Sequence, residues 1–429
     1  MNIDEFDARI RAVPNGGVTS AQGFMAAGVH AGFRKDPKRL DMALLVADEV
    51  CPVAGTFTQN RFCAAPVTVS RAHLGGVGYG MARGVVVNSG NANAATGGAG
   101  ISAAHETCDI ASQVLGCEPE QVLVSSTGVI GQILDIEPFE EGIPAAADAL
   151  SRAGGSDAAL AIMTTDTHPK EYAVTYESQA AGYLGSTFTV GGCCKGSGMI
   201  MPNMATMIAL ITTDAPVRPE ALHGLLRSAV DQTFNRVTVD SDTSTNDTCI
   251  MFASGKAAPM LDPIDEGSDA YQELERAIYV VCEALARGIA ADGEGSTKLV
   301  TVTVSGAATP QDADTAARAV ANSPLVKTAV AGHDCNWGRV AMALGKCGAT
   351  FDQEDVDIDI MGIPVCRDGL TVPFDEEEAL RRFEAPEIVI AADLGAGDAQ
   401  ATVWTCDFTH DYISINVRGQ QVDGGAEWP

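Results

Sequence analysis

Short β-branched strands alternate with amphipathic helices along almost the whole chain, and this alternation most constrains the fold. Segments 82–90 (ARGVVVNSG) and 121–131 (QVLVSSTGVIG) each read as a strand that runs into a glycine-containing turn, and 101–116 between them has helical spacing. Segments 171–178 and 185–192 are spaced as a hairpin. The pattern predicts an α/β or α+β fold rather than a bundle or an all-β sandwich.

The same alternation continues to the C-terminal end. We expect helices at 221–234, 271–292 and within 314–330, and strands at 298–306, 356–366, 387–395 and 401–408. No proline- or serine-rich linker or block of charge marks a boundary, and no repeat of fixed period stands out. At 429 residues, the chain has room for two or three domains or one large α/β body. The sequence alone does not determine where one domain ends and the next begins.

Charge and cysteine content narrow the class of protein. With 27 Lys and Arg against 56 Asp and Glu, the net charge of −29 repels phosphate backbones and anionic membranes, so we expect no nucleic acid and no membrane as partners. The twelve cysteines include the adjacent Cys193 and Cys194 but no C-x-x-C pair and no metal-ligand spacing. With no secretory signal pattern and no apolar run of membrane length, we expect a cytoplasmic protein with reduced thiols and no metal.

The common catalytic motifs are missing. GGCCKGSG resembles a phosphate-binding loop, but Lys195 precedes the last glycines instead of following them. Neither G-x-S-x-G nor H-E-x-x-H occurs. Phosphate-loop, serine-hydrolase and zinc-protease chemistry are therefore not indicated.

Thr206 remains as a candidate, between Ala205 and Met207 at the start of an apolar run. The simplest interpretation is an ordinary strand threonine. The alternative is an N-terminal nucleophile, in which the hydroxyl attacks the preceding carbonyl, the chain breaks before Thr206, and the freed amine becomes the base. An α-amine suits that role because its ordinary pKa is about 7.7 to 8.0.

A family resemblance favours the second interpretation. KGSGMIMPNMATM resembles the self-cleavage segment of the ornithine acetyltransferases (glutamate N-acetyltransferases) of arginine biosynthesis. The resemblance extends over nearly the whole chain, in the same order, through GFMAAGVHAGFRK, VVVNSGNANAATG, VLVSSTGVIG, AIMTTDTHPK, TFNRVTVDSDTSTNDT, SPLVKTAVAGHDCNWGR and DYISIN. It implies a layered α/β fold of the N-terminal-nucleophile kind, autoprocessed, with two strand-rich lobes and the threonine at their interface.

The resemblance also implies a reaction. Thr206 takes acetyl from N2-acetylornithine and passes it to glutamate through an acetyl-threonine ester, without a cofactor and with acetyl-CoA as a candidate co-substrate. The α chain is 1–205, with the oxyanion hole and substrate lysine. The β chain is 206–429, with the nucleophile and a C-terminal substrate-binding lobe. The expected assembly is α2β2.

Site residues follow from matching motifs. The match makes Thr127 and Gly128 the oxyanion pair, and a tight turn after a strand is compatible with that role. The implied substrate-binding residues are Thr167, Lys195, Thr206, Glu294 and Asn416. The alternative for Thr167 is that a neighbouring threonine, Thr164 or Thr165, contacts the substrate. The alternative for Lys195 is a solvated loop lysine, and the alternative for Glu294 is an ordinary surface glutamate. The polar segments STNDT and NSGNANAATG are interpreted as structural or site-supporting.

The chain departs from the family after Asn416. The family ends on a hydroxyl residue that contacts substrate, whereas here Gln421 stands five residues beyond Asn416 in a longer tail. An amide can also bind a carboxylate or an amine, so Gln421 is a candidate substrate ligand. Cys335 replaces an expected proline. Two other functions stay open, namely a self-cleaving N-acyl amino acid amidohydrolase and a non-catalytic amino-acid-binding homologue.

The self-cleavage hypothesis predicts two fragments. Intact mass measured under denaturing conditions should show a break between Ala205 and Thr206, with the second fragment beginning TMIALITTDA. Thr206→Ala should give a folded, uncleaved and inactive chain, because it removes the attacking hydroxyl. Acetyl transfer by Thr206→Ala at the wild-type rate would contradict the assignment of the nucleophile.

Overall fold

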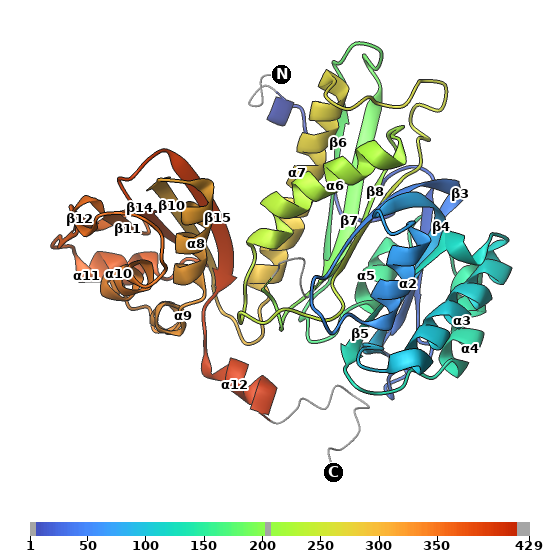
Figure 1. The fold of residues 1–429 in the computed structure, drawn as a ribbon, viewed down its shortest axis with the longest axis horizontal. Helices are drawn as coiled ribbons and strands as arrows, with labels where there is room; N and C mark the ends of the chain where they lie inside the picture. The colour runs from blue at the N-terminus through green and yellow to red at the C-terminus, as the bar shows by residue number, and fades with distance from the viewer. Residues whose placement is uncertain (1–5, 202–206, 418–429) are drawn as a thin grey trace.

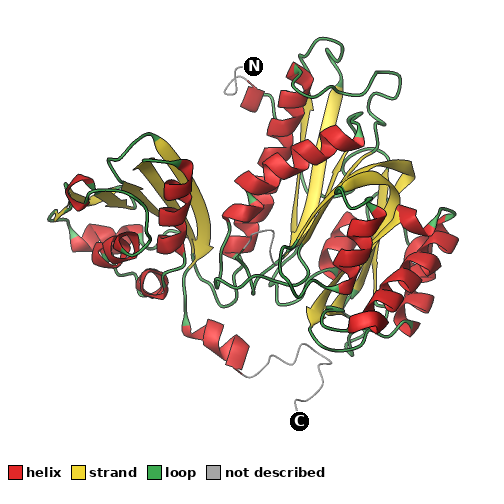
Figure 2. Cartoon of the chain, in the orientation of Figure 1, coloured by secondary structure: helices red, strands yellow, loops and turns green. Residues whose placement is uncertain are grey.

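The computed structural model describes residues 6–201 and 207–417. A large lobe takes in the chain up to residue 292, and a smaller lobe is formed by residues 299–406 (Figure 1). Each lobe is a sheet with helices packed on it (Figure 2). The predicted layered α/β fold with two strand-rich lobes is therefore confirmed.

The large lobe is built on a nine-stranded mixed sheet. Its order is β1-β6-β7-β8-β9-β3-β4-β5, and β2 also pairs with β3. The predicted hairpin is present as the antiparallel pair β6 and β7. The strands are β1 (Arg11–Ala12), β2 (Phe24–Val29), β3 (Met42–Phe57), β4 (Tyr79–Asn91), β5 (Val122–Val129), β6 (Lys170–Glu177), β7 (Thr187–Lys195), β8 (Ile208–Thr213) and β9 (Thr248–Ala253).

Helices cover both faces of this sheet. Helices α6 and α7 pack together over one face, α7 against β6 and β7 and α6 mainly against β3 (Figure 1). On the part of the sheet formed by β2 to β5, α3 and α4 pack beside the side chains of Leu44, Val86 and Val124, whereas α5 packs on the opposite face beside Leu45, Val85 and Val87. The helices are α2 (Ala65–His73), α3 (Gly97–Leu115), α4 (Glu137–Asp148), α5 (Gly155–Ala161), α6 (Pro219–Gln232) and α7 (Asp269–Ala291).

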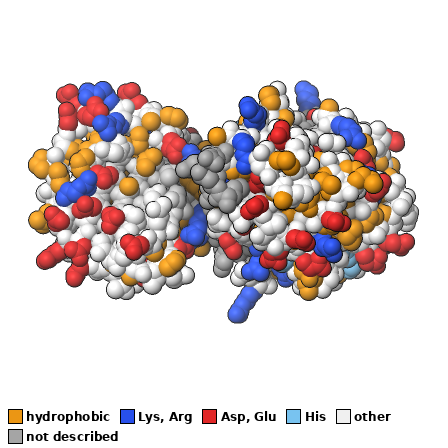
Figure 3. Space-filling model, turned by 90° about the horizontal axis from the view of Figure 1, so that it is seen from above, with side chains coloured by type: hydrophobic (Ala, Val, Ile, Leu, Met, Phe, Trp, Pro, Cys, Tyr) orange, Lys and Arg blue, Asp and Glu red, His pale blue; other side chains and the backbone are white. Residues whose placement is uncertain are grey.

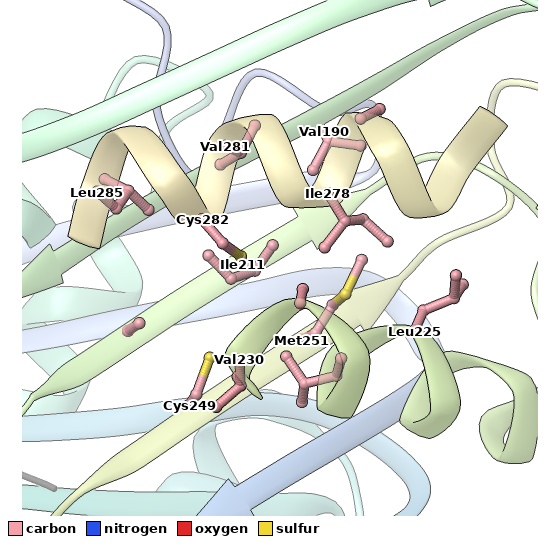
Figure 4. Packing of buried hydrophobic residues seen from close by; sticks show 14 of the residues in the cluster. Val190, Ile211, Leu225, Val230, Cys249, Met251, Ile278, Val281, Cys282 and Leu285 are labelled. Carbon is pink, nitrogen blue, oxygen red and sulfur yellow. The ribbon is translucent and has the colours of Figure 1, made fainter. Parts of the chain in front are cut away.

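Helix α7 shows how the sequence pattern builds the core. The Ser268 hydroxyl caps its first turn by accepting a hydrogen bond from the backbone N–H of Tyr271. Ile278, Val281 and Leu285 recur on one face at helical spacing and are buried. With Ile211 of β8 they belong to one buried cluster, which also holds residues of β9 and α6 (Figure 4).

The smaller lobe is a six-stranded sheet with order β13-β12-β11-β14-β10-β15. Its own core lies between that sheet and α8, α9, α10 and α11. Helix α12 (His410–Val417) follows the lobe and has no buried residue. The other elements are β10 (Leu299–Ala307), β11 (Asp357–Ile360), β12 (Ile363–Arg367), β13 (Leu370–Thr371), β14 (Glu387–Asp393), β15 (Ala399–Cys406), α8 (Pro310–Ala321), α9 (Pro324–Ala331), α10 (Trp337–Gly345) and α11 (Glu376–Arg382).

The positions of the acidic side chains and of the cysteines in the structure are those that the composition suggests. Acidic side chains are spread over both lobes on the face shown in Figure 3, as expected for a solvated acidic surface. All twelve cysteines are free, and most are buried. Within residues 6–201 and 207–417, no helix is long and apolar enough to span a membrane.

The packing of the core predicts that replacing a buried leucine and replacing an exposed leucine have different effects on stability. Leu285→Ala should lower the free energy of unfolding by about 2 to 5 kcal/mol, because its buried side chain leaves a cavity beneath α7. The matched control is Leu184→Ala, whose side chain is 73% exposed and should change stability by less than about 0.5 kcal/mol. Urea unfolding followed by circular dichroism measures both, and equal effects would contradict the packing.

Candidate active site

Lys195 ends strand β7 and is buried, with 4% of its surface exposed. Its ammonium donates a hydrogen bond to the Thr127 hydroxyl, Nζ to Oγ1 3.4 Å. Since a hydroxyl that accepts from an ammonium keeps its own hydrogen, Thr127 is oriented to donate that hydrogen to another acceptor. The contact thus brings together a cation from β7 and a donor from β5.

Gly128 follows Thr127 in a conformation that requires glycine. Its φ is +133°, and a Cβ there would lie 2.3 Å from the carbonyl carbon of Gly90 in the adjacent strand β4. The parallel register places Gly90 opposite Gly128. Close approach of the two strand ends therefore fixes the Thr127–Gly128 turn.

Two carboxylates offset the positive charge of the buried lysines. Lys170 lies between them, with Nζ 2.7 Å from Asp166 Oδ1 and 2.6 Å from Asp292 Oδ2. Asp166 also accepts a hydrogen bond from the Gly196 amide (2.7 Å), which follows Lys195. Asp166, Lys170 and Asp292 were not predicted as site residues, although Asp166 and Lys170 both lie within TTDTHPK and Asp292 lies two residues before Glu294.

This network sets the charge states of its members. Burial opposes ionisation of Asp166, but Lys195 and Lys170 more than offset it and hold the pKa of that carboxyl well below its ordinary value. Burial likewise opposes the charge of Lys170, yet Asp166 and Asp292 leave its pKa raised. For Lys195, burial prevails over the attraction of Asp166, and its pKa is lowered.

Thr167 lies at the exposed edge of the network. Its amide donates to Asp292 Oδ2 (3.0 Å), and its hydroxyl donates to Asp292 Oδ1. Thr164, the neighbouring alternative, instead donates its amide to Asp166 Oδ2 (3.0 Å). Asp292 therefore connects Thr167 to the lysine network.

Glu294 and Asn416 meet on another side of the KGSG segment. Asn416 Nδ2 donates to Glu294 Oε2 (2.8 Å), and the Glu294 amide donates to the Ser197 carbonyl (3.0 Å). The Glu294 carboxyl lies so close to Gly198 that a Cβ there would be 2.3 Å from its Cδ. Helix α12 thus brings Asn416, from the end of the described chain, to the segment that follows Lys195.

Three of the predicted residues lie outside the described chain: Ala205, Thr206 and Gln421. Thr127, Gly128, Lys195, Thr167, Glu294 and Asn416 are described, and the contacts above connect them into one region. That region adjoins the described residues on either side of the predicted cleavage point.

The polar segment 240–248, which ends on the first residue of β9, holds both flanks of that point. Asp240 accepts hydrogen bonds from the amides of Met199 (2.6 Å) and Ile200 (2.8 Å) on the upstream side. On the downstream side, the Thr248 amide donates to the Met207 carbonyl (3.0 Å). The loop interpreted from sequence as structural or site-supporting therefore organises this part of the site.

Asn246 connects the same loop to the Thr127 region. Its side-chain amide donates to the carbonyls of Ala92 (2.6 Å) and Ser126 (2.8 Å). Ser126 precedes Thr127 in β5. The asparagine in STNDT thus fixes the position of the strand that carries the predicted oxyanion pair.

The geometry suits a substrate that carries both signs of charge. A buried ammonium can bind a carboxylate, and the Glu294 carboxylate with the Asn416 amide can bind an ammonium group. The Thr127–Gly128 turn offers donors for a developing oxyanion. In the described part of the chain, no group of three or more His, Cys, Asp or Glu side chains could hold a metal ion.

Fold and site together define an α/β protein with a polar site, part buried and part exposed, whose donors and charges suit acyl transfer. Comparison with known proteins identifies its family. The ArgJ family model matches residues 25–419, and the chain belongs to that family.

Comparisons with individual proteins support the same family. The chain is 49% identical over 403 residues to the arginine biosynthesis bifunctional protein ArgJ of Symbiobacterium thermophilum, covering 94% of this chain and 98% of the relative. It is similar to a crystal structure of Bacillus halodurans ArgJ, at 39% identity and a TM-score of 0.47 over 48% of this chain and 96% of that one. It is also similar to ornithine acetyltransferase of Mycobacterium tuberculosis complexed with ornithine, at 35% identity and a TM-score of 0.40 over 45% and 98%.

Burial of Lys195 leads to two predictions, one for the loss of its side chain and one for the pH dependence of the wild type. Lys195→Ala should still be cleaved but should raise KM at least about tenfold, since a charge-assisted hydrogen bond contributes about 1.5 to 3 kcal/mol. In the wild type, the cation is present below its pKa and lost above it, so kcat/KM should fall with rising pH below the ordinary lysine range.

The control for this experiment is Lys35→Ala, which removes an exposed lysine and should leave both the rates and the pH profile unchanged. Unchanged kinetics of Lys195→Ala for both substrates would contradict a ligand role.

Proposed function

We propose that this chain moves an acetyl group from N2-acetylornithine to glutamate through an acetyl ester on Thr206. Membership of the ArgJ family carries this conclusion and confirms the prediction of an acetyltransferase of arginine biosynthesis. The assignment of individual residues rests on the motif match and on the contacts described above.

The proposed maturation uses the peptide bond before Thr206. The Thr206 hydroxyl attacks the Ala205 carbonyl, the amide nitrogen gains the hydroxyl proton and leaves as an α-amine, and an ester joins the two residues. Water then hydrolyses that ester and releases the Ala205 carboxylate and the Thr206 hydroxyl. One water molecule is consumed and no cofactor is needed.

Acetyl transfer repeats the same ester chemistry with an external acyl donor. The α-amine removes the hydroxyl proton as Thr206 attacks the acetyl carbonyl of N2-acetylornithine, and the proton passes to the departing ornithine nitrogen. Glutamate then attacks the acetyl-threonine ester through its amine. The enzyme returns to its starting state after two half-reactions.

Thr127 and Gly128 are proposed to stabilise the oxyanion of both half-reactions. Lys195 occupies an acceptor position of the Thr127 hydroxyl, which leaves the hydrogen of Thr127 free to point at the developing charge. The same lysine places positive charge beside that donor. This arrangement supports stabilisation of the tetrahedral intermediates.

The substrate groups are assigned by charge. Lys195 binds a substrate carboxylate, and Glu294 with Asn416 binds the side-chain ammonium of ornithine. Thr167 and Gln421 complete the proposed set of substrate ligands. Because ornithine and glutamate share an α-carboxylate, one cation can hold either amino acid in turn.

We further propose that the mature protein is a cytoplasmic α2β2 tetramer without metal or organic cofactor. The boundary at Ala205–Thr206 falls between β7 and β8, so the two chains share the large sheet. Relatives are named bifunctional proteins, which supports acetyl-CoA as a second acetyl donor.

The proposal predicts a trapped acetyl-enzyme. Mixing the purified protein with N2-acetylornithine in the absence of glutamate should add one acetyl group to the fragment that begins with Thr206, because the second half-reaction has no acceptor. Rapid quenching followed by fragment mass measures this adduct, and steady-state rates should show ping-pong kinetics.

Adding glutamate should remove the acetyl group and form N-acetylglutamate in equal amount. Thr206→Ala is the control and should take up no acetyl group. Release of free acetate that does not depend on glutamate would favour the amidohydrolase function instead.

A further inference from the structure

Lys327 of α9, in the smaller lobe, carries a buried amino group that the mechanism above does not use. Only 2% of its surface is exposed. Its Nζ donates hydrogen bonds to the Thr405 hydroxyl (2.7 Å) and to the Cys406 carbonyl, and the Cys406 sulfur lies 3.6 Å away. In the described chain its hydrogen-bond acceptors are thus uncharged, and all of them belong to the last two residues of β15.

Lys327 also holds the chain just beyond β15. Its backbone carbonyl accepts a hydrogen bond from the Phe408 amide (3.2 Å), and its Nζ lies 4.4 Å from the centroid of the Phe408 ring. A cation over an aromatic ring is attracted to it. The Phe408 ring in turn stacks on Tyr412, with centroids 4.8 Å apart and an angle of 20° between the planes. Lys327 is therefore connected through Phe408 to the first turn of α12.

Helix α12 has no core of its own to fix its position. It has eight residues, none of them buried, and it lies outside the packed layers of both lobes (Figure 1). A helix of this length is marginal in isolation. Its direction therefore depends on the contacts that the chain makes where it leaves β15.

The opposite side of this exit segment is held by residues 295–298. The buried Asp407 carboxyl accepts hydrogen bonds from the Thr297 amide (2.7 Å), the Thr297 hydroxyl (2.6 Å) and the Lys298 amide (3.0 Å). The Thr409 hydroxyl donates to the Gly295 carbonyl (2.6 Å). Residues 407–409 are thus clamped between this segment and Lys327.

Gly295 allows the start of α12 to lie directly against it. Its φ is +70°, and a Cβ there would be 2.5 Å from the Tyr412 nitrogen. One turn further along α12, Asn416 Nδ2 donates both to the Tyr412 carbonyl (2.9 Å) and to Glu294 Oε2 (2.8 Å). The position of Tyr412 therefore sets the position of Asn416.

We infer that Lys327 is a positioning residue for substrate binding, which directs the chain beyond β15 so that Asn416 meets Glu294. The inference rests on the proposed function, because Asn416 is a substrate ligand only there. It is carried by the continuous set of contacts from Lys327 through Phe408 and Tyr412 to Asn416.

The chemistry of the lysine side chain supports this role. A methionine has a similar length and could fill the same buried space without the cost of removing an amino group from water. Packing alone therefore does not require a lysine at this position. An amino group has several donors, so it can bind the end of β15 and contact the Phe408 ring at once, which favours a single direction for the exit segment.

The first test compares the kinetics of Lys327→Met with those of the wild type. For a ping-pong enzyme, kcat/KM for each substrate reports its own half-reaction. The value for N2-acetylornithine should fall about tenfold, as expected for the loss of one hydrogen bond to a charged group. The value for glutamate should change less than about twofold, because glutamate has no side-chain ammonium for Glu294 and Asn416 to bind.

Lys298→Met is the matched control. Lys298 is a buried lysine of the same lobe, with 9% of its surface exposed, and its Nζ also binds uncharged acceptors, the carbonyls of Ala385 (2.8 Å) and Glu384 (3.2 Å). Its side chain makes no contact with the segment 405–408 that Lys327 holds. Lys298→Met should therefore leave both values of kcat/KM unchanged.

A double-variant cycle tests whether Lys327 acts through Asn416. Asn416→Ala alone should lower kcat/KM for N2-acetylornithine about as much as Lys327→Met does. The double variant Lys327→Met, Asn416→Ala should be no worse than Asn416→Ala, because the residue that Lys327 positions is already missing. Effects that simply add would contradict the inference.

The second test reads the position of α12 without any substrate. Amide hydrogen exchange of residues 410–417, measured by mass spectrometry, should be faster in Lys327→Met than in the wild type and unchanged in Lys298→Met. Phe408→Leu is a second variant that keeps the lysine but removes the ring between it and Tyr412. It should also speed exchange in α12, so the test does not depend on the folding of Lys327→Met.

Unchanged exchange of α12 in Lys327→Met and Phe408→Leu would overturn the inference, as would equal losses of kcat/KM for both substrates. Failure of the proposed function gives a different result. A wild-type protein that forms no acetyl-threonine contradicts that function, whereas the exchange of α12 still decides whether Lys327 positions the helix.

Discussion

Burial of the Lys195 ammonium is the constraint on which the site depends. A cation removed from water must be compensated, and here Asp166 supplies opposite charge while the Thr127 hydroxyl accepts a hydrogen bond. Asp166 in turn is held by Lys170, which Asp292 also binds. These contacts fix the ends of β5, β6 and β7 and the end of α7 relative to one another. The pieces of the proposed active site are therefore positioned by the requirement that a buried charge be neutralised.

The large sheet explains how a chain cut between β7 and β8 can stay assembled. Strand β8 is paired with β7 on one side and with β9 on the other, and β9 is paired with β3. Residues on both sides of the proposed cut therefore share one hydrogen-bonded sheet and one core beneath α6 and α7. The loss of one peptide bond leaves this ladder and its buried apolar surface intact.

Burial shifts the pKa values of Lys195 and Asp247 in opposite directions, in each case toward the uncharged form. Lys195 keeps charged and polar partners, so burial lowers its pKa without removing its hydrogen bonds. For Asp247, burial raises the pKa of the carboxyl well above its ordinary value, although the Met207 amide and the Lys195 charge act against this effect.

The sequence by itself determined the layered α/β fold, the two strand-rich lobes and the family, because strand and helix periodicities and ordered motifs are local properties of the chain. It also named Thr127, Gly128, Thr167, Lys195, Glu294 and Asn416, through their motifs rather than through any visible contact. Only the tertiary structure decided that Asn416 meets Glu294 and that Asp166 and Asp292 hold the buried lysines. Those facts depend on strand register and on burial between segments far apart in the chain. The sequence does not show whether water or protein surrounds a given carboxylate.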